Sequence, residues 1–310
     1  MRHIRSTTTP SRNGFTLVEL MVVIVIISIL SALTLSGLAG ARQRAKIDKT
    51  KSTIRKLHEI VIPQYESYLS RRVSASGADR TSLAKDKLAK TRVLMVQELP
   101  DLWADVYDTP GDASAANAPA AARRYAAFKQ TLSSAAGTRW ATYRNAYQGA
   151  ECLAMAVTKG GFAADAGESF RADEIGDIDA DGAPEFRDGW GRPIAFIRWP
   201  AGFSSPIQQQ DAAMNPDPFD PFKVSTAVAF PSTAQVDYGL IPLIYSPGPD
   251  ESTNDPLAGS SGYGFGGGPV SWLGSTPIQT TRLGSPPAGF PTDPTAVRDN
   301  ITNHDLMSKR

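Results

Sequence analysis

Apolar residues form one long, uninterrupted run near the start of the chain and then recur at helical spacing. Leu20 to Ala41 contain no charged residue. As a helix rising about 1.5 Å per residue, this run is roughly 33 Å long, which is enough to cross a hydrocarbon core of about 30 Å. From Ile47 to Tyr68, apolar residues fall at steps of seven, three and four. One long helix is therefore predicted to continue past the membrane span.

The middle of the chain predicts further helices. Apolar positions between residues 88 and 106 suit an amphipathic segment interrupted at Pro100, those at 125–132 suit a short helix, and those at 140–157 suit a third helix that a glycine pair ends. Pro63 lies inside the long first helix and is expected to kink it, because proline removes a backbone donor. Gly77 is expected to end that helix.

After these helices the pattern changes to short β-prone runs between turn residues. Strands are predicted at 193–199 and 240–245, with a third candidate at 224–230. The stretches 201–221 and 246–294 are rich in Gly, Pro, Ser and Asp, and are interpreted as long surface loops. Helices followed by a small, mostly antiparallel sheet indicate the α+β fold class.

Composition, charge and the few motifs for catalysis limit the classes of function that this protein could have. A net charge of +1 over 310 residues argues against a nucleic-acid-binding protein. Cys152 is the single cysteine, so no intrachain disulfide can form, and its apolar neighbours predict a buried thiol. His58-Glu59 begins like a zinc-protease motif, but Ile62 occupies the position of the second histidine. The glycine-rich stretch 262–267 is not followed by a helical pattern, so it is interpreted as a loop. We expect a protein that is not an enzyme.

Glu19 is the one charge at the start of the apolar run. Ionisable residues at a membrane are costly and usually have a partner and a function. The residues Gly14-Phe15-Thr16-Leu17-Val18-Glu19 follow the basic residues Arg2, Arg5 and Arg12. This segment resembles the N-terminus of prepilin-like proteins, which are the type IV pilins and the pseudopilins of type II secretion.

The resemblance implies a processed and polymerised membrane protein without an enzymatic role. Prepilin peptidase would cut between Gly14 and Phe15, and Phe15 would be N-methylated. Glu19 would pair with the Phe15 amine of a neighbouring copy during assembly, because a buried carboxylate needs a cation. The implied location is the inner membrane, single-pass, with the N-terminus cytoplasmic and the C-terminal part periplasmic, followed by a filament. The implied partners are prepilin peptidase, other pseudopilins and copies of itself, the inner-membrane secretion platform and membrane lipid, with no nucleic acid.

Other interpretations stay open. Basic residues from Arg42 to Lys56 outnumber those before the span, so the positive-inside rule alone places the C-terminal part in the cytoplasm. The resemblance implies the opposite topology, and we follow the resemblance.

Ala39-Gly40-Ala41 also fits the cleavage site of an ordinary signal peptide, which predicts an exported soluble binding protein or hydrolase. A plain membrane anchor leaves Glu19 unexplained. A minor type IV pilin, binding a ligand through residues 246–294, shares the same start.

Three later segments resemble the major pseudopilin of type II secretion, in the same order. Asp188–Pro193 resembles its Asp-x-Trp-Gly-x-Pro signature, Tyr245–Asp250 its Tyr-Ser-x-Gly-x-Asp strand end, and Asp299–Ile301 its acidic tail. The chain departs from that family through insertions at about 77–160 and 256–298. The resemblance implies a pilin-like α+β fold in five parts: a leader (1–14), a transmembrane or filament-core helix (15–41), the exposed half of that helix (42–76), a helical insertion (77–161) and a β-rich domain with long loops (162–310).

A run of carboxylates carries the second chemical signal. Asp177, Asp179, Asp181, Glu185 and Asp188 fall at positions one, three, five, nine and twelve of a loop with glycine at position six. This is the ligand spacing of an EF-hand-type calcium loop. Asp-Gly is also a hairpin signal by itself, so a calcium loop and a solvated turn both remain open. The resemblance implies a separate calcium site after the Tyr-Ser strand, where the candidate counterparts are Asp250, Asp255, Asp299 and Asp305.

Overall fold

The structure is a computed structural model that describes residues 14–110, 117–135, 147–162, 166–224, 238–249, 265–266, 290–291 and 300–308. For residues 35–37, 265–266 and 290–291 it describes the main chain only. The chain divides into two compact units, Met1–Ala45 and Lys46–Arg310.

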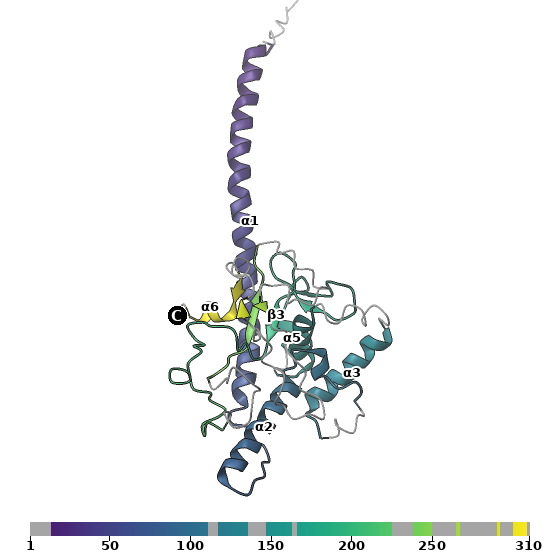
Figure 1. The fold of residues 1–310 in the computed structure, drawn as a ribbon. Helices are drawn as coiled ribbons and strands as arrows, with labels where there is room; N and C mark the ends of the chain where they lie inside the picture. Colours follow the sequence, from purple (N-terminus) through teal and green to yellow (C-terminus); the bar gives the residue numbers. More distant parts are fainter. Residues whose placement is uncertain are drawn as a thin grey trace, which may run out of the picture. The chain divides into compact units, whose positions relative to one another are not determined.

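Helix α1 (Leu17–Ser67) begins in the first unit and is drawn in purple in Figure 1. In this unit the large apolar side chains that the structure describes are exposed, with Leu17 at 75 % and Ile27 at 55 % of their full accessible area. The most apolar 18-residue window has a mean hydropathy of 2.7, and none of it is buried. By length and composition this helix can cross a membrane, as predicted.

The second unit uses the remaining part of α1 as a core element. Ile54, Leu57 and Val61 are fully buried, which confirms the apolar stripe that their helical spacing predicts. The helix continues through Pro63 and ends at Ser67. It therefore ends well before Gly77, where the sequence pattern placed its end.

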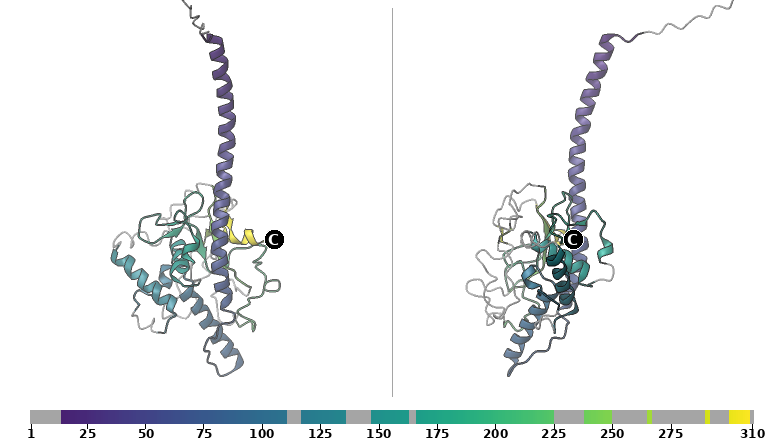
Figure 2. Two further views of the ribbon diagram at one scale, coloured as in Figure 1. Left: turned by 180° about the vertical axis from the view of Figure 1, so that it is seen from behind. Right: turned by 90° about the vertical axis from the view of Figure 1, so that its right-hand side faces the viewer.

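The predicted middle helices are confirmed in the part of the chain that the structure describes. They are α2 (Arg80–Glu98), α3 (Ala120–Ala135) and α5 (Gln148–Lys159), with 3₁₀ helices η1 (Trp103–Asp105) and η3 (Gly167–Ser169). Asp79 caps α2, since its Oδ1 accepts a hydrogen bond from the Ser82 amide at 2.6 Å. Helix α3 contacts both α2 and α5 (Figures 1 and 2). The first part of the predicted 140–157 helix lies outside the described residues.

Short antiparallel strands complete the fold. They are β1 (Ile175–Gly176), β2 (Glu185–Phe186), β3 (Ala195–Ile197), β4 (Leu243–Ser246), β5 (Phe265–Gly266), β6 (Phe290–Pro291) and β7 (Ile301–Thr302), and helix α6 (Asn303–Met307) follows. The pairs β1-β2 and β5-β6 form two-stranded sheets, and β3-β4-β7 form a three-stranded one. Strands β3 and β4 confirm the two main strand predictions, but both are shorter than predicted and β4 extends one residue further, to Ser246. All but the first residue of the third candidate, 224–230, lies outside the described residues.

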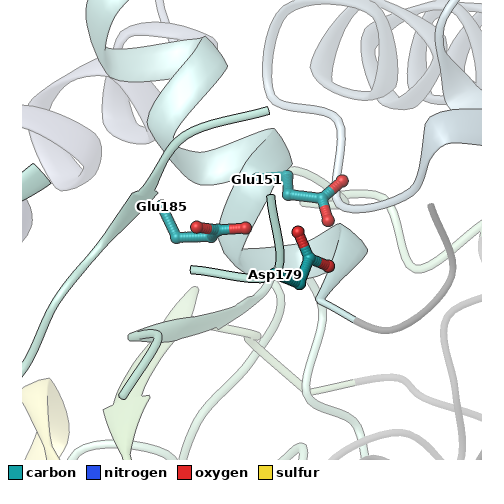
Figure 3. Close-up of side chains that lie close together, drawn as sticks. All are labelled: Glu151, Asp179 and Glu185. Atoms are coloured by element: carbon teal, nitrogen blue, oxygen red, sulfur yellow. The ribbon is translucent and has the colours of Figure 1, made fainter. Parts of the chain in front are cut away.

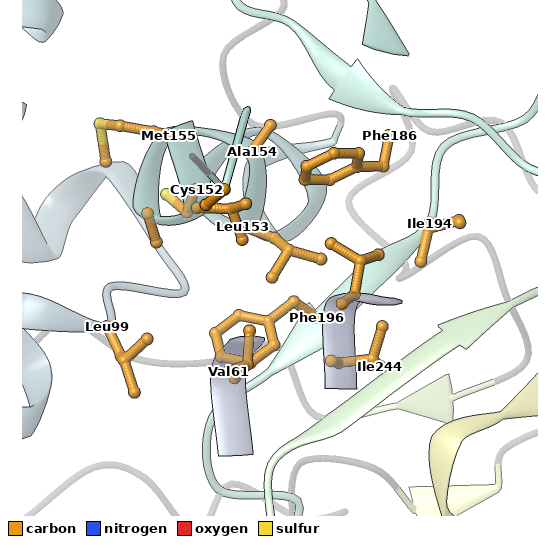
Figure 4. Close-up of a cluster of buried hydrophobic side chains, with 14 of the residues drawn as sticks. Val61, Leu99, Cys152, Leu153, Ala154, Met155, Phe186, Ile194, Phe196 and Ile244 are labelled. Carbon is orange, nitrogen blue, oxygen red and sulfur yellow. The ribbon is translucent and has the colours of Figure 1, made fainter. Parts of the chain in front are cut away.

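The core lies where α5 meets α1 and the three-stranded sheet. Figure 4 shows Leu153 of α5 beside Val61 of α1, Phe196 of β3 and Ile244 of β4, all almost fully buried. Each such side chain contributes about 1.5–3 kcal/mol when it is removed from water. Cys152 is fully buried in the same cluster, as predicted. Because α5 also contacts β2, the core fixes the base of the acidic loop between β1 and β2.

Candidate functional sites at the helix start and in an acidic cluster

The start of α1 is closed by a capping box. The Thr16 amide and hydroxyl both donate to Glu19 Oε2, at 2.9 and 2.8 Å. In return the Glu19 amide donates to Thr16 Oγ1 at 3.2 Å. Thr-x-x-Glu before an apolar run is a known signature of a helix start, so the sequence carried a signal for this second role of Glu19. The carboxylate thus has a local partner within its own chain.

The two residues of the predicted cleavage site precede this cap. Phe15 keeps 84 % of its accessible area exposed, and, apart from Gly14 and its chain neighbours, no described heavy atom lies within 4 Å of the position that a Cβ on Gly14 would occupy. Both residues are therefore accessible in the described chain, as a peptidase substrate requires.

The predicted acidic loop is a hairpin loop whose ends are paired. Ile175 pairs with Phe186 and Gly176 with Glu185. Gly182 adopts a φ of 101°, a conformation that glycine allows at position six of the loop. Backbone amides point at the first aspartate, with the Asp181 amide 3.1 Å from Asp177 Oδ1. The loop is therefore a hairpin turn, and three of its aspartates gather at its tip.

The cluster consists of two carboxylate trios that share Asp179. The first is Asp177, Asp179 and Asp181, and the second is Glu151, Asp179 and Glu185; within each trio, one carboxylate oxygen of every residue lies within 4.8 Å of the others. Figure 3 shows Glu151, which comes from α5, with its carboxylate beside that of Asp179. Sequence reasoning missed Glu151, because it lies in a helix far from the loop and carries no motif of its own.

Burial makes this cluster electrostatically unusual. Glu151 is 1 % exposed, and Asp181 and Glu185 are fully buried. Trp103 Nε1 donates to Glu151 Oε2, and the Ile178 amide donates to Glu185 Oε2 at 2.9 Å. The other oxygen of each glutamate, together with Asp181 Oδ2, is buried without a hydrogen-bond partner.

The same burial shifts the protonation of these groups. Removal from water, together with the neighbouring negative charges, raises the pKa of Glu185 to about 8 and that of Asp181 to about 6. The pKa of Glu151 is raised well above its ordinary value for the same reasons. A nearby positive charge would lower these pKa values again, because it favours the ionised form of each carboxyl group.

The start of α1, with the predicted cleavage site and Glu19, lies in a segment that matches a known family of proteins. Residues 9–35 match a family model described as the prokaryotic N-terminal methylation motif. This match includes Gly14, Phe15 and Glu19. The chain is a prepilin-like protein. No significant match to it was found among the curated proteins or the solved structures.

Membership in this class has direct consequences. A prepilin-like protein is a precursor that prepilin peptidase processes, and its role is that of a structural, pilin-type subunit that assembles with similar subunits. The exposed apolar part of α1 indicates membrane anchoring. Sequence analysis predicted both the class and the long helix with an α+β region after it.

Asp188 was predicted to be the twelfth ligand position of the acidic loop. In the structure of the prepilin-like protein it does not belong to either carboxylate trio. Its Oδ1 accepts hydrogen bonds from the amides of Trp190 and Arg192, at 2.8 and 2.9 Å. Its Oδ2 accepts one from the Ser246 hydroxyl at 2.7 Å. The side chain is committed to holding the turn after β2 and to joining that turn to β4.

This turn is also docked on α1. The Gly189 amide donates to Thr50 Oγ1 at 2.8 Å. A Cβ on Gly189 would lie 2.2 Å from the Lys46 carbonyl oxygen, so only glycine permits the approach.

Of the four candidates for a second calcium site, Asp250, Asp255 and Asp299 lie outside the described residues. Asp305 instead accepts a hydrogen bond from the Thr302 hydroxyl at 2.8 Å, at the start of α6.

Proposed function

We propose that this prepilin-like protein is a structural subunit of a type II secretion pseudopilus. It is held in the inner membrane with its N-terminus in the cytoplasm, and its C-terminal domain lies in the periplasm. After processing it polymerises through its N-terminal helix and supports protein secretion. Its partners are prepilin peptidase, other pseudopilins, copies of itself and the inner-membrane secretion platform.

The observation that carries this proposal is the meeting of three segments that resemble the major pseudopilin. Asp188 at the start of the first segment bonds Ser246 in the second. Arg192 Nη1 of the first donates to the Gly248 carbonyl of the second at 2.9 Å. Ser246 pairs with Ile301, which ends the third segment. Residues far apart in the sequence thus support one another, as expected if they form one inherited structural unit.

The apolar part of α1 supports assembly through this helix. Its described apolar side chains are exposed in the single chain, and burial of apolar surface against lipid or neighbouring helices is strongly favourable. Glu19 lies at the beginning of this surface, so packing it away from water requires a cation. The Phe15 amine of a neighbouring processed copy is such a cation.

Deletion of the gene tests the secretion role. We expect secreted proteins to accumulate in the periplasm, surface fibres to remain, and a plasmid copy of the gene to restore secretion. Normal secretion together with loss of surface fibres would contradict the proposal and favour a minor type IV pilin. A soluble mature chain that starts near Arg42 would contradict both, and favour an exported binding protein or hydrolase.

A further inference from the structure

We propose that Glu151 of helix α5 and the carboxylates of the 177–185 loop together bind one calcium ion. The loop supplies Asp177, Asp179, Asp181 and Glu185, and the core helix supplies the fifth carboxylate. The ion then fastens the β1-β2 hairpin to the core, independently of how the N-terminal helix assembles.

The first argument is geometric. Calcium loops of the EF-hand type take ligands from positions one, three, five and nine and from a bidentate acidic residue at position twelve. Here the twelfth residue, Asp188, is engaged by two amides and a hydroxyl. Glu151 compensates, because one of its carboxylate oxygens lies within 4.8 Å of oxygens on Asp179 and Glu185.

The second argument rests on buried oxygens. Oε1 of Glu151, Oε1 of Glu185 and Oδ2 of Asp181 are buried and accept no hydrogen bond. Among the described residues, none of these three side chains takes part in an ion pair. An uncompensated buried acceptor costs free energy comparable to a lost hydrogen bond or more. Glu151 is independent of the loop, yet it directs such an oxygen into the same cluster.

The third argument identifies the ion. Every candidate ligand atom in the two trios is a carboxylate oxygen, and neither trio contains histidine or cysteine, which disfavours zinc and copper. Calcium accepts six to eight oxygens in a flexible arrangement, whereas magnesium demands a near-ideal octahedron and retains several waters. Carboxylates drawn from a loop and a separate helix fit calcium better.

Calcium titration of the full-length protein tests the proposal. Detergent-solubilised protein is stripped with EDTA and titrated with CaCl₂, and separately with MgCl₂, by calorimetry. The test variant Glu151→Gln keeps the size of the side chain and an acceptor for Trp103, but removes the charge. Glu168→Gln neutralises an exposed carboxylate in η3 and is the matched control.

We expect the wild type and Glu168→Gln to bind calcium equally, in preference to magnesium, and Glu151→Gln to bind it at least tenfold more weakly. Without calcium, Glu151→Gln should melt no lower than the wild type, because glutamine has nearly the same shape and keeps an acceptor for the Trp103 indole. An unchanged melting temperature separates a lost ligand from misfolding. Unchanged calcium affinity in Glu151→Gln, or a wild type that binds no calcium at millimolar concentration, would overturn the proposal.

Terbium, a luminescent stand-in for calcium, locates the ion. Because the Trp103 indole is hydrogen-bonded to Glu151, light absorbed by that ring should be transferred to an ion held there. We expect tryptophan-excited terbium emission that calcium suppresses and that Trp103→Phe reduces severalfold. Emission that survives Trp103→Phe unchanged would place the ion away from Glu151 and refute the site.

Discussion

Glu19 has two roles that single substitutions can separate. In the isolated chain it closes the capping box with Thr16 through bonds of 2.8 to 3.2 Å. In the proposed filament it is the buried partner of the Phe15 amine. Loss of a helix cap costs about 1 kcal/mol, or roughly fivefold in an equilibrium constant. Removal of one partner of a buried ion pair costs about 3–5 kcal/mol, which is more than about 100-fold.

Three variants exploit this difference. Glu19→Gln keeps an acceptor for the Thr16 amide and removes the charge, so we predict a loss of assembly of about 100-fold or more. Thr16→Ala removes the hydroxyl bonds and keeps the charge, so assembly should fall by no more than about fivefold. Glu19→Ala removes both and should behave like Glu19→Gln. All three should be cleaved and inserted in the membrane.

The assay is quantitative immunoblotting of sheared filaments against membrane-bound subunit, with the N-terminal mass of each variant confirming its processing. Assembly of Glu19→Gln within fivefold of the wild type would refute the charge-pairing argument and leave the capping box as the role of Glu19. Equal loss in Thr16→Ala and Glu19→Gln would show that the start of the helix, rather than the charge, limits assembly.

The globular unit gives three further predictions, each measured by urea unfolding of the full chain in detergent. Arg198→Met should cost about 3–5 kcal/mol, because the fully buried guanidinium forms ion pairs with Asp101 and Asp105, at N···O distances of 2.9 and 3.1 Å. Burial lowers the pKa of His304 from 6.5 to about 4, so the unfolded chain binds a proton at a higher pH than the folded chain does. Stability is therefore greatest above pH 6.5, and about 3 kcal/mol of it should be lost as the pH falls to 4. His304→Gln should make the free energy of unfolding depend less steeply on pH. Gly189→Ala should cost about 1–3 kcal/mol, because its Cβ meets a main-chain oxygen of α1 at 2.2 Å.

Matched controls decide these predictions. Arg171→Met removes an exposed cation of a surface ion pair and should change stability by less than about 1 kcal/mol. Gly167→Ala adds a Cβ whose nearest heavy neighbour is 4.0 Å away, so it should be nearly neutral. The reasoning fails wherever a control costs as much as its test variant, or where His304→Gln keeps the full wild-type pH slope.

The elements that the sequence predicted well are those with strong periodicity. The stripe of Ile54, Leu57 and Val61 identified the buried face of α1, because helical spacing and burial are directly linked. The strand at 195–197 was predicted instead from a short β-prone run that follows turn residues, and all three of its residues are buried. The end of α1 was predicted too late, because no local signal at Ser67 competes with the glycine at position 77.

The candidate sites were predictable only in part. Loop spacing brought Asp177, Asp179, Asp181 and Glu185 to attention, and the structure does gather them. Glu151 was missed because its approach to the loop depends on tertiary packing of α5 against β2, which leaves no trace in spacing. Asp188 suits the twelfth loop position in sequence. In the structure its oxygens instead accept hydrogen bonds from backbone amides of the following turn and from the Ser246 hydroxyl.

The most direct test of the central claim is the N-terminal mass of the mature protein from membranes, with and without prepilin peptidase. The account predicts a chain that begins at N-methylated Phe15 when the peptidase is present, and that retains residues 1–14 when it is absent. A chain that begins near Arg42 in both cases would contradict it, because the apolar helix would then be a discarded signal and Glu19 would be absent from the mature protein.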